Sequence, residues 1–182
     1  MMKLNLLLLF SFIYITAAAQ DKKPDLPIDD GTKLITYSKV MEMPGVTKDS
    51  LFAKALAWCN SYFTNPADVI REKDAESGKI LCKARFKVMN PPDKKGLTTE
   101  GGVVQYSMNL LFKEGRYKIV LTEYNWKQAS NYPAEKWMDT TNAFYKPEYA
   151  HYLQQVSDKS KEILSAFEKG MKMDNSKKKD DW

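Results

Sequence analysis

Apolar and polar residues alternate along two stretches in the middle of this chain. Residues 80–88 alternate between apolar and mostly cationic side chains, and residues 103–113 alternate between apolar and mostly uncharged polar ones. Successive side chains of a β-strand point to opposite faces of the sheet, so this period predicts two strands that each have one apolar face. Segments rich in β-forming residues predict three further strands at 34–43, 68–73 and 116–126.

Two other stretches have apolar residues three and four positions apart, which is the spacing of one face of an α-helix. The first covers residues 48–63, where Thr47 is placed to cap the N-terminus and Asn65-Pro66 to end the helix. The second covers residues 148–173. We therefore expect two amphipathic helices, each able to cover part of a sheet.

The segments between these elements differ in character. A hairpin connection is predicted at 74–78 and an exposed loop at 90–96. Residues 20–33 show no apolar period and predict a leader without fixed structure. Residues 127–148 are irregular but rich in aromatic side chains, so we expect this segment to pack back onto the domain.

The resulting order, β-α-β-β-β-β-α, predicts a single α+β domain over residues 34–173. Because the alternation gives the central strands one apolar face each, we expect a two-layer sandwich. In it, two helices cover one face of an antiparallel sheet of about five strands, and the opposite face stays open to solvent.

The open face is the part of this predicted fold that is most suited to binding. In the third and fourth strands it carries Lys83, Arg85, Lys87, Gln105, Ser107 and Asn109. The phase of the fifth strand is ambiguous, because two apolar sets, one beginning at Tyr117 and one at Val120, compete for the covered face. Tyr124 and Trp126 are therefore also candidates for the open face. A shallow site there would suit an anionic ligand, a glycan or a partner protein, and a merely solvated sheet face is the alternative.

Two short motifs connect the chain with a known family. The run 40–46 (VMEMPGV) precedes a helix from Lys48, and the run 74–80 (DAESGKI) opens a strand that is basic on one face and apolar on the other. These features resemble the secreted bacterial domain of unknown function with a TATA-binding-protein-like fold, over about residues 35–126. The chain departs from that pattern at Cys82, where the family commonly has a small residue such as Gly.

The resemblance implies a curved antiparallel sheet with two helices on one side. It brings no catalytic or ligand-binding residues that can be carried over to this chain. Similarity to the fold of a DNA-binding protein does not transfer DNA binding, because function belongs to sites and not to folds.

The N-terminus has the features of an export signal. Lys3 supplies a positive start, residues 4–16 are mainly apolar, and small residues at 17–19 form a processing site before Gln20. Residues 1–19 are therefore predicted to be a signal peptide, and the protein to be periplasmic or extracellular. The apolar run is shorter than the roughly 20 residues that span a bilayer, so we expect no transmembrane segment in the mature chain.

The charge of the chain excludes few partners. A formal net charge of +5 is too small and too evenly spread for a nucleic-acid footprint, so we expect no nucleic-acid partner. The basic cluster Lys177-Lys178-Lys179 lies in a polar segment, 174–182, that is predicted to be a disordered tail. Weak attraction of this tail to an anionic membrane surface is the alternative interpretation.

No set of residues with catalytic, cofactor-binding or metal-binding spacing is found. His151 is the only histidine, so a site with several imidazole ligands is impossible, and no nucleophile is spaced to pair with it. Cys59 and Cys82 both fall on apolar faces, one on the first helix and one on the third strand. They are predicted to be either two buried thiols or a disulfide, which export would permit.

Three hypotheses of function follow. The first is an exported, non-enzymatic binding or interaction domain of unknown ligand, without a cofactor. The second is a hydrolase or other enzyme whose site is assembled only by folding. The third is an accessory protein attached to the envelope surface through the lysine-rich tail.

Overall fold

The computed structural model describes residues 24, 26–127 and 131–173. The predicted signal peptide and the predicted tail at 174–182 lie outside the described residues. The strands are β1 (Tyr37–Glu42), β2 (Ile70–Asp74), β3 (Lys79–Met89), β4 (Glu100–Lys113), β5 (Arg116–Lys127) and β6 (Asn131–Pro133). The helices are α1 (Lys48–Tyr62), α2 (Pro66–Val69), the 3-10 helix η1 (Ala134–Met138) and α3 (Glu148–Lys172).

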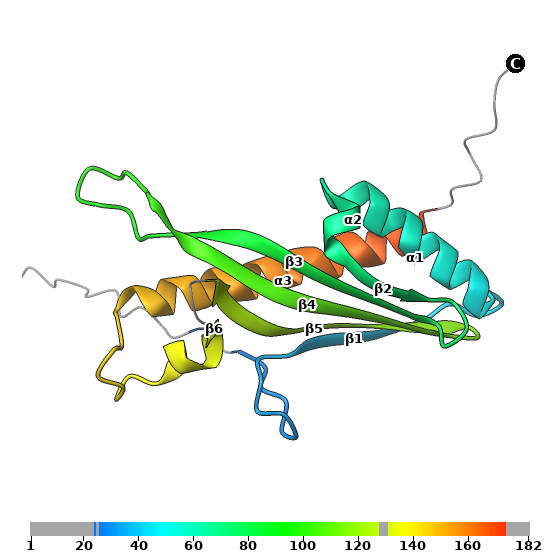
Figure 1. Cartoon of the computed structure of the whole chain (residues 1–182), viewed down its shortest axis with the longest axis horizontal. Helices are drawn as coiled ribbons and strands as arrows, with labels where there is room; N and C mark the ends of the chain where they lie inside the picture. Colours follow the sequence, from blue (N-terminus) through cyan, green and yellow to red (C-terminus); the bar gives the residue numbers. More distant parts are fainter. Residues whose placement is uncertain (1–23, 25, 128–130, 174–182) are drawn as a thin grey trace, which may run out of the picture.

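All strand pairs are antiparallel, in the order β1-β5-β4-β3-β2, with the short β6 added to β5. The long strands β3, β4 and β5 follow one another along the chain and form the centre of the curved sheet (Figure 1). The long helix α3 runs along one face of this sheet, and α1 lies over one end (Figure 1). The predicted two-layer α+β sandwich is therefore confirmed.

The inner face, which the helices cover, holds the core. Its strand residues include Ile80, Cys82, Val88, Val104, Met108, Leu110, Ile119 and Leu121, each at most 1% exposed. Phe167 of α3 is fully buried between Trp58 of α1 and Tyr117 of β5, at ring-centroid distances of 4.9 and 5.4 Å. Gly170 permits this packing, because a Cβ atom there would lie 2.1 Å from Cδ1 of Trp58.

The helix boundaries follow local chemistry, with one difference from prediction. The Thr47 hydroxyl accepts a hydrogen bond from the Ser50 N–H at 3.2 Å, so it caps α1 as expected. The strand predicted at 68–73 was placed too early: proline favours the first turn of a helix, and Pro66 begins α2, so β2 starts at Ile70.

Part of the predicted leader is folded, which corrects the predicted start of the domain. Leu26 is 7% exposed and belongs to the core, and Ile28 pairs with Ile35 in an isolated bridge. Between them, the Asp29 carboxylate accepts hydrogen bonds from the backbone N–H and the hydroxyl of Thr32, at 2.8 and 2.9 Å. The apolar period is absent because this segment is held by one buried side chain, a backbone bridge and a turn.

The aromatic segment predicted at 127–148 packs onto the domain as expected, but on the inner side. Trp137 of η1 is 1% exposed and lies against Trp126 of β5, at 5.5 Å between ring centroids. Tyr149 and Tyr152 of α3 complete this aromatic cluster. The cluster closes one end of the inner layer near the start of α3, where η1 and β6 lie in Figure 1.

Candidate functional site

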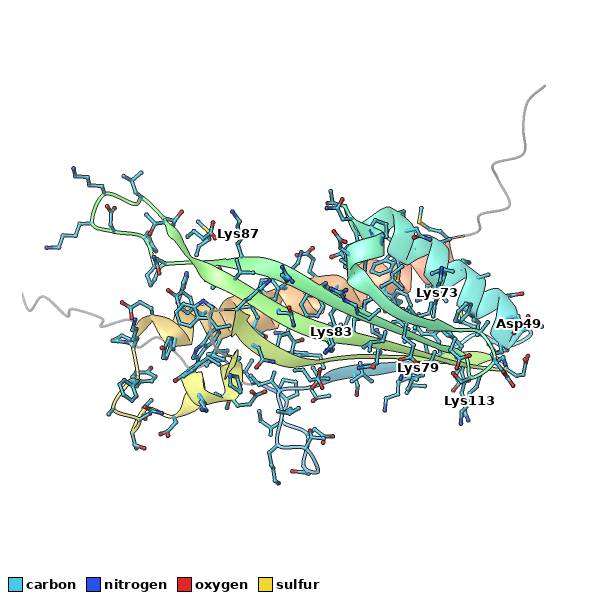
Figure 2. The ribbon with its side chains drawn as sticks, viewed as in Figure 1. Asp49, Lys73, Lys79, Lys83, Lys87 and Lys113 are labelled. Atoms are coloured by element: carbon cyan, nitrogen blue, oxygen red, sulfur yellow. The ribbon has the colours of Figure 1, made fainter. Side chains whose placement is uncertain are left out.

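The outer face of the sheet, which no described helix covers, carries a row of cations along β3. In the β3–β4 register, Lys83 lies opposite Ser107, Arg85 opposite Gln105 and Lys87 opposite Val103. Figure 2 shows Lys79, Lys83 and Lys87 spaced along the sheet. The side chains of Lys83, Arg85 and Lys87 are exposed, as the alternation predicts.

The three polar residues predicted on β4 also lie on this face, but they are less available. Gln105 and Asn109 are half-buried, and Gln105 Oε1 accepts a hydrogen bond from Arg85 Nε at 3.3 Å. Ser107 is only 3% exposed, and its hydroxyl donates to the Glu123 carboxylate at 2.6 Å. The prediction of Ser107 as an open contact residue is therefore wrong, because Glu123 occupies its hydrogen-bonding group.

Tyr124 and Trp126 lie on the inner face, so their assignment to the open face is also wrong. The β4–β5 register shifts between Gln105 and Ser107, and Glu123 has a positive φ of 56°. This bulge reverses the phase of β5. Before the bulge, Tyr117 and every second residue after it point inward. After the bulge, Tyr124 and Trp126 point inward.

The environment of Tyr124 fits its inner position. It is 1% exposed, and its hydroxyl lies 2.7 Å from Ser160 Oγ of α3. Burial raises the pKa of this phenol above its ordinary value. The only sequence signal of the bulge is that the apolar alternation of β5 loses step around Thr122-Glu123.

Charge compensation is uneven along β3. Lys79 forms an ion pair with Glu72 of β2 at 3.0 Å, and Lys87 forms one with Glu100 at 2.7 Å. Between them, Lys83 and Arg85 have no ion-pair partner among the described residues. The centre of β3 therefore carries two uncompensated positive charges.

A cleft of about 830 Å³ begins at these two cations. It lies at the N-terminal end of β2, between the edge of β3 and the C-terminal end of α1. Its lining brings together residues from six elements, among them Tyr62, Asp68, Arg71, Lys83, Arg85 and Lys159. Sequence reasoning identified Lys83 and Arg85 but missed the other contributors, because α2, β2 and α3 are brought to the cleft only by folding.

A second hollow lies at the other end of the outer face. Val40 and Leu111 are exposed apolar residues, 55% and 39% exposed, on either side of Lys118 in one cross-strand row. Together with Lys113 and Arg116, they line a space of about 290 Å³. This end of the face therefore combines two exposed apolar side chains with three cations.

The two cysteines are free, buried thiols whose sulfur atoms lie 4.0 Å apart. A disulfide requires about 2.05 Å between the sulfurs. The hydrogen bond between the thiols, together with burial, raises the pKa of Cys59. Of the two predicted alternatives, the structure has the pair of buried thiols.

The described residues bear on two other expectations. They contain no group of three or more His, Cys, Asp or Glu side chains placed to hold a metal ion. None of the helices at 24, 26–127 and 131–173 is both long and apolar enough to cross a membrane. What the outer face offers is fixed cations next to hydrogen-bonding side chains, an arrangement that can hold an anionic group.

Comparison with known proteins points to the same architecture. The model of the domain of unknown function DUF4468, described as having a TBP-like fold, matches residues 37–127. A crystal structure of a DUF4468 family protein from Bacteroides ovatus is similar, with a TM-score of 0.64 and 16% identity over 83% of this chain and 92% of that one. A TBP-like protein from Parabacteroides distasonis has a TM-score of 0.56 and 17% identity, over 79% of this chain and 97% of that one. No curated protein matches the sequence.

Proposed function

The chain belongs to the DUF4468 family, and we propose that it is a non-enzymatic domain that binds an anionic ligand on its outer sheet face. The description of the family specifies a TBP-like fold and no activity. One observation carries this proposal. Lys83 and Arg85 are exposed cations without an ion-pair partner in the described part of the chain, and both line the cleft of about 830 Å³. Such charges attract anions and hold them by charge-assisted hydrogen bonds.

The spacing of the cations narrows the kind of ligand. Side chains two residues apart on a strand lie about 7 Å apart on the same face. Lys83, Arg85 and Lys87 therefore form a regular row that suits a ligand with repeated negative groups. A chain with acidic groups at a similar repeat, whether polypeptide or glycan, would contact all three cations.

The cellular location is part of the proposal. The basic, apolar and small-residue segments of 1–19 support export and processing before Gln20. Expression in a Gram-negative host, followed by fractionation and mass spectrometry, should give a periplasmic or secreted protein that begins at Gln20. A cytoplasmic protein that keeps residues 1–19 would overturn this part.

Charge reversal tests the binding proposal. The variant K83E/R85E/K87E should lose at least about 10-fold in affinity for poly-glutamate or for heparin, because three attractive contacts become repulsive. The matched control K94E/K95E/K161E has the same net charge but changes exposed residues on the 90–99 loop and on α3. The affinity of this control should stay within about 3-fold of the parent protein, because only the long-range effect of the net charge, which salt screens, is changed.

Two results would overturn the proposal. One is the absence of measurable binding of either polyanion to the parent protein at moderate salt. The other is an equal loss of affinity in both triple variants, which would indicate a general charge effect and not a site. Circular dichroism and urea unfolding of each variant separate loss of binding from loss of fold.

A further inference from the structure

The backbone of β3 has two edges, and one of them pairs with β4. The Gly78 carbonyl accepts from the Phe112 N–H at 2.8 Å, and the Asn90 N–H donates to the Thr99 carbonyl at 2.8 Å. Backbone groups alternate between the two edges of a strand. The even-numbered residues of β3 therefore bond to β4, and the odd-numbered ones face the opposite edge.

That opposite edge is only partly occupied. Strand β2 pairs with Lys79 to Cys82, and its first residue, Ile70, lies opposite Cys82. At the far end, Gln155 of α3 takes both backbone groups of Met89, at 2.8 Å to the N–H and 2.9 Å to the carbonyl. The pair Ile70–Cys82 is closed by the backbone groups of the residues beside it, so the pairing with β2 extends to the Lys83 N–H. Between these two closures, no strand of the described residues pairs with the edge-facing backbone groups of Arg85 and Lys87.

The free backbone groups and the cleft lie in the same place. Lys83 and Arg85 line the cleft of about 830 Å³, and its other walls come from Arg71 of β2, the end of α1 and Lys159 of α3. We propose that an extended, acidic peptide segment of a partner protein adds to this edge as a further strand, in line with β2. This inference rests on the proposed function and specifies its ligand.

Strand addition uses both the free backbone groups and the cationic side chains of this edge. The main-chain hydrogen bonds supply affinity that does not depend on sequence, and the side chains on alternate positions supply specificity. On the outer face, alternate acidic side chains of the incoming strand would lie beside Lys83, Arg85 and Lys87. On the inner face, the other set would point into the cleft.

Charge selects the peptide over another copy of this chain. Two copies joined through this edge would bring two rows of cations together, and like charges on neighbouring strands are destabilising. The lysine cluster at 177–179 has the same sign as the edge, so this segment is also a poor occupant. An acidic segment is attracted by the charges that disfavour both alternatives.

The test uses the full mature chain and a short fluorescein-labelled peptide of alternating Glu and Thr residues. Arg85→Thr removes the charge but keeps the backbone N–H, whereas Arg85→Pro removes both. The N–H of Arg85 faces the free edge, so proline there breaks no backbone hydrogen bond of the parent fold, and both variants lose the side-chain bond to Gln105. We expect Arg85→Pro to bind the peptide about 10-fold more weakly than Arg85→Thr, as expected for one lost hydrogen bond plus the obstruction by the proline ring.

Equal affinities of Arg85→Pro and Arg85→Thr would overturn strand addition. Should Arg85→Pro fail to fold, two N-methylated peptides decide the question. One carries methyl groups on the Glu nitrogens and the other on the Thr nitrogens. Strand addition requires that one of the two loses at least about 10-fold in affinity while the other stays near the parent peptide. If both bind like the unmodified peptide, the inference is wrong.

The outcomes separate this inference from the proposed function. If neither the peptide, poly-glutamate nor heparin binds, the proposed function fails and strand addition fails with it. If the polyanions bind and K83E/R85E/K87E abolishes binding, but the backbone variants and methylated peptides change nothing, only strand addition is wrong. Binding of heparin without binding of the peptide would make the ligand a glycan.

Discussion

The two faces of the sheet are built from the same strands, yet they have different physical roles. On β3, inward-facing residues such as Cys82 and Val88 are fully buried, while the outward-facing Lys83, Arg85 and Lys87 are charged and exposed. Burial makes the inner face the source of stability, because apolar area removed from water is the main favourable term in folding. The outer face contributes little to that term. Its charges can therefore serve recognition without weakening the fold.

The largest expected effect is on the inner face, at Phe167. Phe167→Ala should lower the free energy of unfolding by about 3–5 kcal/mol, because it opens a cavity between Trp58 and Tyr117. Urea unfolding followed by circular dichroism measures this loss. The matched control is Val40→Ala on the outer face, which is 55% exposed and should change stability by less than about 0.5 kcal/mol. Similar losses for both variants would contradict the division of roles.

A smaller effect is expected at Tyr124, the residue that sequence alone left between the two faces. Ser160 Oγ lies 2.6 Å from the Val156 carbonyl, to which it donates, so the Tyr124 hydroxyl donates to Ser160. Tyr124→Phe should then lower stability by about 1 kcal/mol, because one buried hydrogen bond is lost.

The double variant sharpens this measurement. Tyr124→Phe combined with Ser160→Ala should lose less stability than the sum of the two single variants, because it leaves no partner unsatisfied. If Tyr124 pointed to solvent, Tyr124→Phe would have no effect and the two changes would be additive. Either of those results would restore the outer-face assignment.

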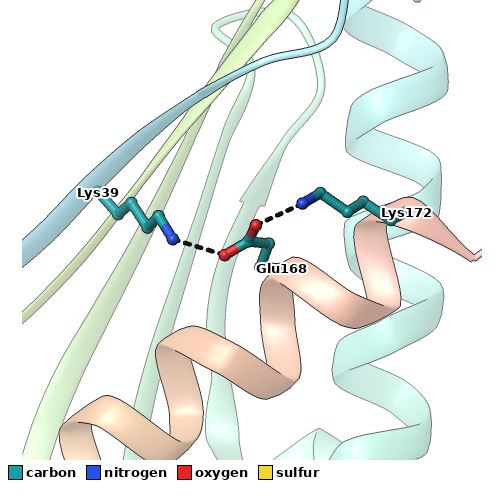
Figure 3. A network of polar contacts seen from close by, with 3 residues as sticks. All are labelled: Lys39, Glu168 and Lys172. Atoms are coloured by element: carbon teal, nitrogen blue, oxygen red, sulfur yellow. Dashed lines mark hydrogen bonds and ion pairs between the residues drawn. The ribbon is translucent and has the colours of Figure 1, made fainter.

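The smallest expected effect lies at the border of the two layers. Lys39 of β1 and Lys172 of α3 each contact the Glu168 carboxylate at 2.5 Å (Figure 3). The hydrogen bonds from Lys172 and Lys39 lower the pKa of Glu168 from 4.5 to about 2. The folded state therefore holds this proton less tightly than the unfolded state does.

The sign of the pH dependence follows from that shift. The stabilisation by Glu168 is complete above its unfolded pKa of 4.5 and is lost as the pH falls toward about 2. Glu168→Gln should flatten the dependence of unfolding free energy on pH in this window and leave the slope at neutral pH unchanged. An identical pH profile for the variant and the parent would show that the network does not act on folding.

Much of the architecture could be predicted from sequence, because it depends on local periodicity. The alternation in β3 placed Lys83, Arg85 and Lys87 on the open face, and helical spacing with Thr47 as a cap located α1. The resemblance to the family with the TBP-like fold, which the same runs supported, is confirmed. These features need only neighbours within one strand or one helix.

Other features depend on contacts between distant segments, which no local pattern encodes. The bulge at Glu123 exists because Ser107 and Gln105 pair with β5 in two different registers, and it sends Tyr124 inward. The approach of Cys59 to Cys82 depends on how closely α1 settles on the sheet. These contacts were therefore predicted wrongly or left open.

The sequence by itself determined that one sheet face would be apolar and the other cationic, since side-chain direction in a strand alternates with every residue. Only the tertiary structure decided where the edge of this cationic strand lacks a neighbouring strand. The late start of β2 at Ile70 and the bonds of Gln155 to Met89 leave one edge of β3 without a neighbouring strand around Arg85 and Lys87. The physical reason is that hydrogen-bond pairing between strands is a property of two segments, and neither segment alone specifies it.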